Sequence, residues 1–164
     1  MSTIHNDLQR MALQEELLQL DRLDENTAWE LGLHIKAICE ARNQSVTIEV
    51  RRAKETLFFY AMPGTTPNNA EWVRRKRNTV ELLHRSSYAT GMAHQKDSTS
   101  LPLKTGVSLA DYAEHGGSFP LRVKGVGCVG AVTVSGVPQR EDHGIVVEAL
   151  AALCGVPLAS VCLD

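Results

Sequence analysis

Two histidines and their neighbours stand in contexts that could support binding or proton transfer. His115 directly precedes Gly116 and Gly117. An imidazole that titrates near neutral pH can bind a metal or shuttle a proton, and two glycines allow a ligand to approach the backbone closely. The alternative is a histidine at a helix end, where the C-terminal dipole favours a positive charge. The sequence leaves both interpretations open.

Asp142 and His143 form an acidic–imidazole pair in the first turns of the last predicted helix. The helix dipole favours a carboxylate at this position, which is a sufficient structural explanation. The functional alternative is a polar pair at the mouth of a pocket. His143 shares a helix face with Val147 and Leu150, so we expect it to be partly buried.

Lys76 lies on the apolar stripe of a predicted helix, together with Trp72 and Val80. A lysine in this position usually lays its stem over apolar surface and keeps its ammonium group in water. If it is instead buried beside Trp72, it becomes a candidate for binding an anion or contacting another subunit. The arginines at 74, 75 and 77 spread over the other faces of the helix. We interpret them as a solvated face or an interface rim.

Composition limits the classes of partner. The chain has 164 residues, a net charge of −2, 43% hydrophobic and 22% charged residues. These values are typical of a globular domain and give no general attraction to nucleic acid or an anionic membrane. No apolar run approaches the roughly 20 residues that a membrane span requires, and the N-terminus lacks a signal-peptide pattern. We therefore expect a cytoplasmic protein with no nucleic-acid or membrane partner.

Cysteine spacing and the known catalytic motifs give no sign of a metal or hydrolase site. The four cysteines stand in apolar contexts without a CxxC pair, which favours reduced structural thiols; they are Cys39, Cys128, Cys154 and Cys162. The sequence contains no H-E-x-x-H motif, nucleophile elbow or P-loop. We therefore predict no metal site and no complete catalytic constellation.

Hydrophobic periodicity predicts alternating groups of helices and strands. Helices are expected over residues 6–20, 24–43, 68–87 and 138–154, with short helical pieces between 88 and 115 that include Ser108–Gly116. Strands are expected over 45–52, 55–62, 118–124 and 127–136, and a short strand over 157–164. Two hairpins separated by a helix favour an antiparallel sheet with helices on its faces.

The apolar pattern also predicts how the layers form. Residues 45–52 alternate as a half-buried strand does, whereas 127–136 and "LFFY" are apolar on both faces and need cover on both sides. We expect the first two helices on one face and helices 68–87 and 138–154 on the other. Apolar residues would then remain exposed: Val73, Leu82, Ile145 and Ala152. This predicts an even-numbered homo-oligomer with a contact at helix 68–87 and its arginines.

Glycines punctuate the second hairpin. Gly125 and Gly127 lie where the chain must turn, and Gly130 lies inside a strand. A glycine inside a strand indicates that another segment packs closely over it. "GVGCVG" fits G-x-G-x-x-G, but it leads into a strand and not into a helix, so it is no dinucleotide-binding fingerprint.

The stretches "HGGSFPLRV" and "GVGCVGAVTVSGVPQREDHGIVVEAL" resemble the signature of haem-degrading-domain proteins of the GlcG and HbpS type. In that family a Gly-Gly-x-Pro strand start leads into a glycine-rich hairpin and a helix with an early acidic residue. An uncharacterised branch of the family is more similar still. It shares the "EWVRRKRNTVELLHRSS" helix and the Asp142-His143 pair. The resemblance covers nearly the whole chain from the second helix onward.

This resemblance implies a profilin-like α/β/α sandwich with a mainly antiparallel sheet. One domain would span residues 1–164, with 1–23 as a helix that could lie at its periphery. It also implies self-association, and haem or a related planar anion as ligand, with His115 as a candidate axial ligand. The candidate ligand-binding residues are His115, Gly116, Gly117, Lys76, Asp142 and His143. The leading hypothesis is an oligomeric small-ligand-binding protein; the alternatives are an assembly protein without catalytic activity and an enzyme of oxidative haem breakdown.

Overall fold

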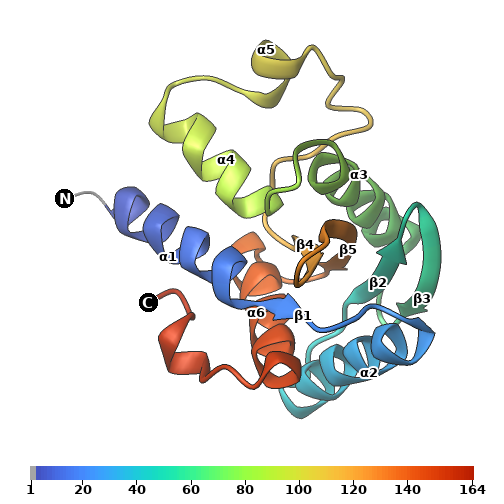
Figure 1. Cartoon of the computed structure of the whole chain (residues 1–164). Coiled ribbons are helices and arrows are strands. Elements are labelled where there is room, and N and C mark those ends of the chain that lie inside the picture. The colour runs from blue at the N-terminus through green and yellow to red at the C-terminus, as the bar shows by residue number, and fades with distance from the viewer. Residues whose placement is uncertain (1–2) are drawn as a thin grey trace.

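A five-stranded sheet forms the centre of the computed structural model, which describes residues 3–164 (Figure 1). The strand order is β1-β4-β5-β2-β3. The strands are β1 (Gln19–Leu20), β2 (Thr47–Arg52), β3 (Glu55–Ala61), β4 (Ser118–Val123) and β5 (Gly127–Ser135). All neighbouring strands pair antiparallel except the short β1, which runs parallel to β4. The predicted mainly antiparallel sheet with flanking helices is confirmed.

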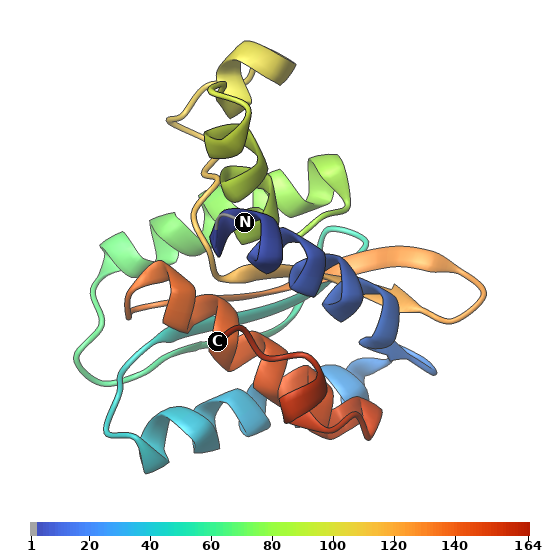
Figure 2. The ribbon, with the colours of Figure 1, turned by 90° about the vertical axis from the view of Figure 1, so that its left-hand side faces the viewer.

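Helices cover both faces of this sheet. They are α1 (Thr3–Leu17), α2 (Glu25–Ala41), α3 (Pro67–Leu83), α4 (Ser87–Lys96), α5 (Leu101–Thr105) and α6 (Gln139–Cys154). In Figure 2, α2 and α6 lie below the sheet, and α3 and α4 lie above it. The predicted pairing of the first two helices on one face is wrong, because α6 packs beside α2 while α1 packs against α4.

The two faces of the sheet differ in chemistry. Toward α2 and α6, the strands present a continuous apolar core: Ile48, Val50, Phe119, Leu121, Val132 and Val134. Toward α3, they present buried polar side chains: Thr47, Glu49, Ser118, Thr133 and Ser135. The prediction of a half-buried β2 is therefore wrong, since its polar face is covered as fully as its apolar face. The buried polar face is the one that can hold a site.

Strand β3 is an edge strand with one side open in the described residues. Its side chains are mostly exposed or half-buried, and Phe59 is exposed although Phe58 is buried under α2. The expectation that "LFFY" is covered on both faces is wrong, because α3 lies over β5, β4 and β2 instead. Cover on both sides is confirmed for β5, whose residues Gly130–Ser135 are all buried.

Two predicted elements, the helix over Ser108–Gly116 and the C-terminal strand, differ from the structure. Residues 107–117 contain a turn at Ser108–Asp111 in place of the predicted helix. The Asp111 amide donates to the Ser108 carbonyl and closes the turn, and the Ala110 amide donates to the Ser108 hydroxyl. The predicted strand over 157–164 is also wrong. Leu158–Ser160 form a 3-10 helix, η1, and Val161 after it is fully buried.

Contacts with the C-terminal segment and α6 hold α1 in place. Met11 is fully buried, the Gln14 amide donates to the Val161 carbonyl at 2.6 Å, and Arg140 of α6 pairs with Asp7 at 2.7 Å. These contacts join both ends of the described chain to the sandwich.

Gly130 in β5 is needed because the neighbouring backbone lies where a side chain would begin. A Cβ atom at this position would lie 1.9 Å from the Arg51 carbonyl oxygen of β2. No real Cβ contact is that short, so the strands would have to separate. The close packing predicted for this glycine is confirmed.

We predict that Gly130→Ala lowers the free energy of unfolding by a few kcal/mol, about the cost of overpacking a core. The matched control is Gly144→Ala in α6, where an added Cβ meets nothing within 4 Å and alanine is the better helix former by about 1 kcal/mol. Urea denaturation of both variants measures the difference. Equal stability of Gly130→Ala and the wild type would contradict the packing argument.

Candidate functional site

A shallow pocket of about 300 Å³ lies where the N-terminal ends of α3 and α6 meet the end of β5. Helix α3 supplies Asn68, Asn69, Trp72 and Lys76. The end of β5 supplies Ser135, the turn after it supplies Gly136 and Val137, and α6 supplies Gln139 and Asp142. His115 stands at the edge of the pocket. The structure thus brings together three of the predicted candidates, Lys76, His115 and Asp142. It places His143 elsewhere.

Lys76 and Asp142 form a buried ion pair in the wall of this pocket. The Lys76 Nζ atom lies 2.9 Å from Asp142 Oδ2 and donates to the Val134 carbonyl at 3.1 Å. The other carboxylate oxygen of Asp142 accepts from the Val137 amide at 3.1 Å. The two residues are only 3% and 2% exposed. The pair links α3 to α6 past the end of β5, so the usual solvated lysine is ruled out here.

Burial dominates the electrostatics of the pair. It lowers the pKa of Lys76 and raises the pKa of Asp142, because it penalises the charged form of each. The attraction between the two charges opposes both shifts. Removing one partner would leave an uncompensated buried charge, which costs about 3–5 kcal/mol in comparable cases.

Gly117 makes room for this pair. Gly117 has φ +135°, and a Cβ atom there would lie 2.3 Å from the Val134 carbonyl oxygen and 2.8 Å from Lys76 Nζ. A Cβ atom at Gly116 would lie 2.3 Å from the Gln139 carbonyl oxygen. The close approach at Gly117 therefore serves the protein's own ion pair, whereas Gly116 lets the chain pass close to the start of α6.

His115 presents an imidazole without a hydrogen-bond partner in the described residues. Its ring meets the Trp72 ring edge-on, with centroids 5.0 Å apart, and the Arg75 guanidinium lies over Trp72 at 4.4 Å. Partial burial, with the nearby charges of Lys76 and Arg75, lowers the pKa of His115 below its usual 6.5. The ring is therefore neutral at pH 7, with a nitrogen lone pair free to bind. The preceding helix, α5, ends at Thr105, well before His115, so the helix-end interpretation is wrong.

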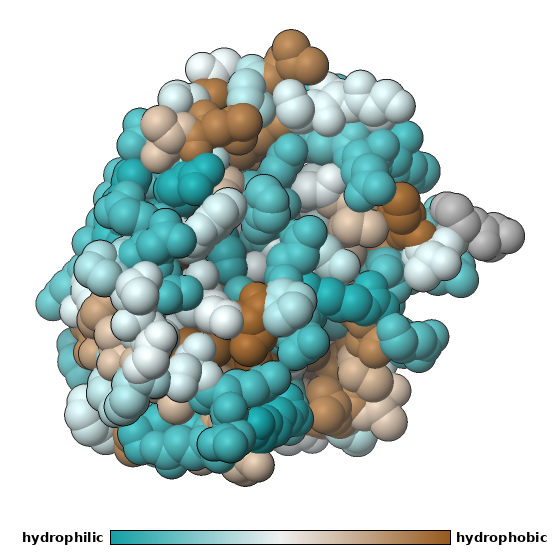
Figure 3. Space-filling view, turned by 180° about the vertical axis from the view of Figure 1, so that it is seen from behind, coloured by the Kyte–Doolittle hydropathy of each residue, from teal (hydrophilic) through white to brown (hydrophobic). Residues whose placement is uncertain are grey.

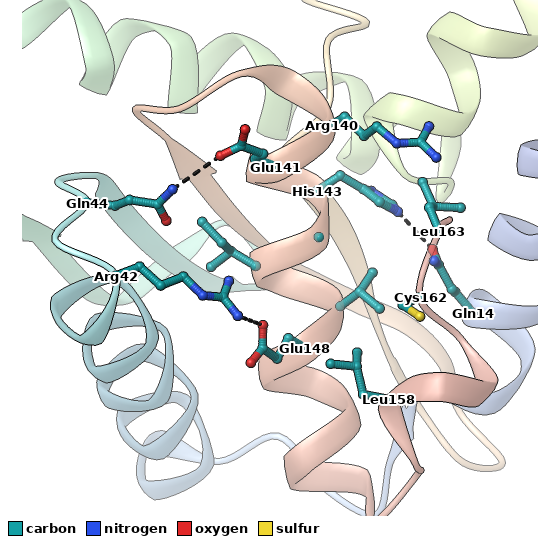
Figure 4. A pocket seen from close by; sticks show the side chains of 13 residues that line it. Gln14, Arg42, Gln44, Arg140, Glu141, His143, Glu148, Leu158, Cys162 and Leu163 are labelled. Carbon is teal, nitrogen blue, oxygen red and sulfur yellow. Dashed lines mark hydrogen bonds and ion pairs between the residues drawn. The ribbon is translucent and has the colours of Figure 1, made fainter.

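His143 is fully buried on the other side of α6, between Tyr88 and Phe119. Its Nε2 atom lies 2.8 Å from Gln14 Oε1 (Figure 4). Gln14 uses its amide nitrogen on Val161, so its oxygen must accept and His143 Nε2 carries the proton. The Nδ1 atom has no partner in residues 3–164. His143 is a core histidine and not the second half of a pair with Asp142.

Figure 4 shows the groove that His143 does line, on the outer side of α6. Arg42 pairs with Glu148 at 2.5 Å, and Gln44 donates to Glu141 at 3.2 Å, along one rim. The C-terminal residues Leu158, Cys162 and Leu163 form the other rim. This groove is separate from the pocket of His115.

Sequence reasoning missed several polar residues of the pocket. Ser135 is the last residue of β5, Gln139 is the first residue of α6, and Asn68 and Asn69 belong to the first turn of α3. The sequence feature that could have indicated these pocket residues is the clustering of amide and hydroxyl side chains at two predicted helix starts. It is weak, because such residues are also ordinary helix caps. A neighbouring polar contact between His94 and Glu114 was missed as well.

The arginines of α3 make contacts within the chain. Arg74 pairs with Glu71 and Asp111 at 3.0 Å each, Arg75 donates to the Leu109 carbonyl, and Arg77 pairs with Glu49 at 3.1 Å. They fasten the 107–113 loop and the polar sheet face. Val73 and Ile145, expected to remain exposed, are buried, whereas Leu82 is exposed as expected.

Within residues 3–164, no group of three or more His, Cys, Asp or Glu side chains is arranged to hold a metal ion. None of the helices described is long and apolar enough to cross a bilayer.

The four cysteines are free thiols, and burial raises the pKa of Cys39 to about 11.

We predict that His143 makes stability depend on pH. Complete burial lowers its pKa to about 3, so between pH 6.5 and 3 the unfolded chain binds a proton that the folded chain does not. The free energy of unfolding should then fall with decreasing pH in this window, with a contribution approaching about 1.4 kcal/mol per pH unit. In urea denaturation, the free energy of unfolding of His143→Gln should depend less steeply on pH than that of the wild type. The control is His34→Gln, at an exposed position, which should keep the wild-type slope. Equal slopes for wild type and His143→Gln would contradict the assignment.

Comparison with known proteins gives concordant matches. The family model described as "Haem degrading protein HbpS-like" matches residues 23–151. A UPF0303 protein of Azotobacter vinelandii is 50% identical over 161 residues, covering 98% of this chain and 97% of the relative. A UPF0303 protein of Serratia proteamaculans is 47% identical, covering 96% and 98%.

Two solved structures share the fold. The crystal structure of the Ybr137w protein matches with a TM-score of 0.81 and 25% identity, covering 90% of this chain and 87% of that one. A PduOC:heme complex matches with a TM-score of 0.69, covering 79% and 94%; at 18% identity it is evidence for the fold alone. The family signature, the relatives of nearly equal length and the shared sandwich agree, and the chain belongs to the HbpS-like haem-degrading protein family, among its UPF0303 members.

Proposed function

We propose that this chain is a small-ligand-binding protein that holds a planar anion against His115 and Trp72. The observation that carries the proposal is the free imidazole of His115. It is neutral at pH 7, exposed, and makes no hydrogen bond in the described residues, although it borders a pocket lined by an aromatic ring and amide groups. The cations of Lys76 and Arg75 near this ring favour an anionic ligand.

Haem is the candidate that family membership supports, and the donor set fits it. A neutral imidazole is a common axial ligand of haem iron, and the Trp72 side chain gives the porphyrin an aromatic neighbour. The pocket volume of about 300 Å³ lies at the lower end of the range for small-ligand sites. A porphyrin would therefore be enclosed only in part.

The residues of this chain would have distinct tasks toward such a ligand. His115 would bind the iron, Trp72 would contact the ring system, and the Lys76–Asp142 pair would hold the pocket wall in shape. A bound haem supplies redox chemistry at its iron. The protein's contribution is the axial ligand and the positive potential around it.

We predict that one equivalent of hemin gives a sharpened Soret band with the wild-type protein, because His115 ligates the iron. His115→Ala should lose this band, while His34→Ala, which removes another exposed histidine, should keep it. Absorbance titration measures both. Metal-free protoporphyrin should bind the wild type and His115→Ala alike, since it offers no iron to ligate.

The outcomes separate the alternatives. A Soret band that is unchanged in His115→Ala would overturn the ligand assignment. No hemin binding, combined with binding of other planar anions, would keep the binding proposal and exclude haem as its ligand.

We also propose that the chain forms an even-numbered homo-oligomer. Trp29 and Leu33 lie one turn apart on α2 and are 57% and 43% exposed, beside the open edge of β3. Exposed apolar side chains grouped in this way mark contact surfaces, and two-fold assemblies are the commonest outcome. On the rear face, by contrast, the surface is mostly hydrophilic, with apolar residues in separate spots (Figure 3). The arginines at 74 and 77 of α3 are paired within the chain, which leaves α2 and not α3 as the proposed contact surface.

We predict that the wild type sediments as an oligomer at micromolar concentration and that Trp29→Lys with Leu33→Lys shifts it to the 18.0 kDa monomer. The control is Leu103→Lys, at a position on α5 that is 79% exposed, which should leave the assembly intact. A monomeric wild type would refute self-association. An oligomer that survives the double substitution would refute the contact on α2.

A further inference from the structure

Several hydrogen-bond donors that line the His115 pocket have no partner within residues 3–164. Ser135 is only 5% exposed and lines the pocket, yet its hydroxyl makes no hydrogen bond within residues 3–164. A polar group buried to this degree is normally satisfied. The Ser135 Oγ atom is not among the fully enclosed unpaired polar atoms, so it opens onto the pocket and is available to a ligand there.

The orientation of two amide side chains follows from their backbone contacts. The Thr66 amide donates to Asn69 Oδ1 at 3.0 Å, and the Gly116 amide donates to Gln139 Oε1 at 3.0 Å. A backbone N–H can bond only to the oxygen of a side-chain amide. The NH₂ groups of Asn69 and Gln139 thus have no partner among residues 3–164, and both residues line the pocket.

The surrounding charges favour a negative ligand. Asn69 lies in the first turn of α3 and Gln139 in that of α6, helices of 17 and 16 residues, whose N-terminal ends carry partial positive charge. Lys76 uses two of its three ammonium hydrogens, on Asp142 and Val134. The nearby carboxylates are engaged: Asp142 by Lys76 and Val137, and Glu114 by His94 and the Leu101 amide.

We propose that this pocket binds the carboxylate group of a small organic acid through the Ser135 hydroxyl and the amide groups of Asn69 and Gln139. The proposal rests on the proposed function, because it names the chemical class that the same pocket takes. The flat, two-oxygen carboxylate offers acceptors to several donors at once, and the planar remainder of the ligand contacts Trp72 and His115. This role of Asn69, Gln139 and Ser135 is independent of iron ligation by His115.

The test uses Trp72 as the reporter. In a Trp29→Phe background, Trp72 is the remaining tryptophan of the chain, so its emission reports directly on the pocket. Benzoate is the probe, benzamide is its uncharged counterpart and inorganic phosphate is the competing oxyanion. We expect saturable binding of benzoate, binding of benzamide at least about tenfold weaker, and no displacement by phosphate at equal concentration.

Asn69→Asp and Ser135→Ala test the donors. The carboxylate introduced by Asn69→Asp would keep the acceptor for the Thr66 amide but replace the free donor by a negative oxygen, so benzoate affinity should fall by about tenfold or more. Ser135→Ala should also weaken benzoate binding. Asn26→Asp makes the same change in the first turn of α2, outside the pocket, and should leave affinity unchanged.

Each contrary result overturns the inference. The inference fails if benzoate does not bind saturably, if benzamide binds as tightly as benzoate, or if phosphate binds more tightly than benzoate. It also fails if Asn69→Asp leaves the benzoate affinity unchanged. Hemin binding through His115 could persist in all four cases, because it is measured by the Soret band. Failure of the carboxylate site is thereby distinguished from failure of the proposed function.

Discussion

The buried ion pair between Lys76 and Asp142 is the constraint around which this structure is arranged. It joins a helix on the polar face of the sheet to a helix on the apolar face, past the end of β5. A charge pair of this kind is stable only if its remaining hydrogen bonds are supplied. The Val134 carbonyl and the Val137 amide supply them, and the missing side chain of Gly117 allows the backbone to approach the pair closely.

The sheet has one apolar and one polar face, and the ion pair connects the helices that cover them. The apolar face under α2 and α6 supplies most of the hydrophobic stabilisation. The opposite face can therefore carry polar groups, which pair with each other and with α3 through contacts such as Glu49–Arg77 and Ser118–Thr133. Where α3 and α6 begin, this polar layer reaches the surface and leaves donors unused. The pocket is the open end of a buried polar layer.

The sequence predicts the elements better than their arrangement. Periodicity located the two hairpins and the main helices, and glycine positions located the turns and the close packing at Gly130. Which helix covers which face could not be read from amphipathic patterns, since α1 and α6 both carry apolar stripes and only tertiary contacts decide between them. The turn at Ser108 and the 3-10 helix at Leu158 are short segments without period, where local propensity decides little.

The candidate site was predictable in part. Lys76, His115 and Asp142 stood out by residue type, and the structure brings them together. The adjacency of Asp142 and His143 in sequence was misleading, because neighbouring residues on a helix point about 100° apart and these two face opposite environments. The amide donors of Asn69 and Gln139 could not be distinguished from helix caps until their backbone partners were known.

A double-mutant cycle on the ion pair tests this account most directly. Urea denaturation would give the free energies of unfolding of wild type, Lys76→Met, Asp142→Asn and the double variant. The account predicts that each single substitution costs about 3–5 kcal/mol, and that the double variant loses at least about 2 kcal/mol less than the sum, because no unpaired charge remains buried. Additive losses would show that the two residues act independently, and would contradict the claim that their pairing holds the layers and the pocket together.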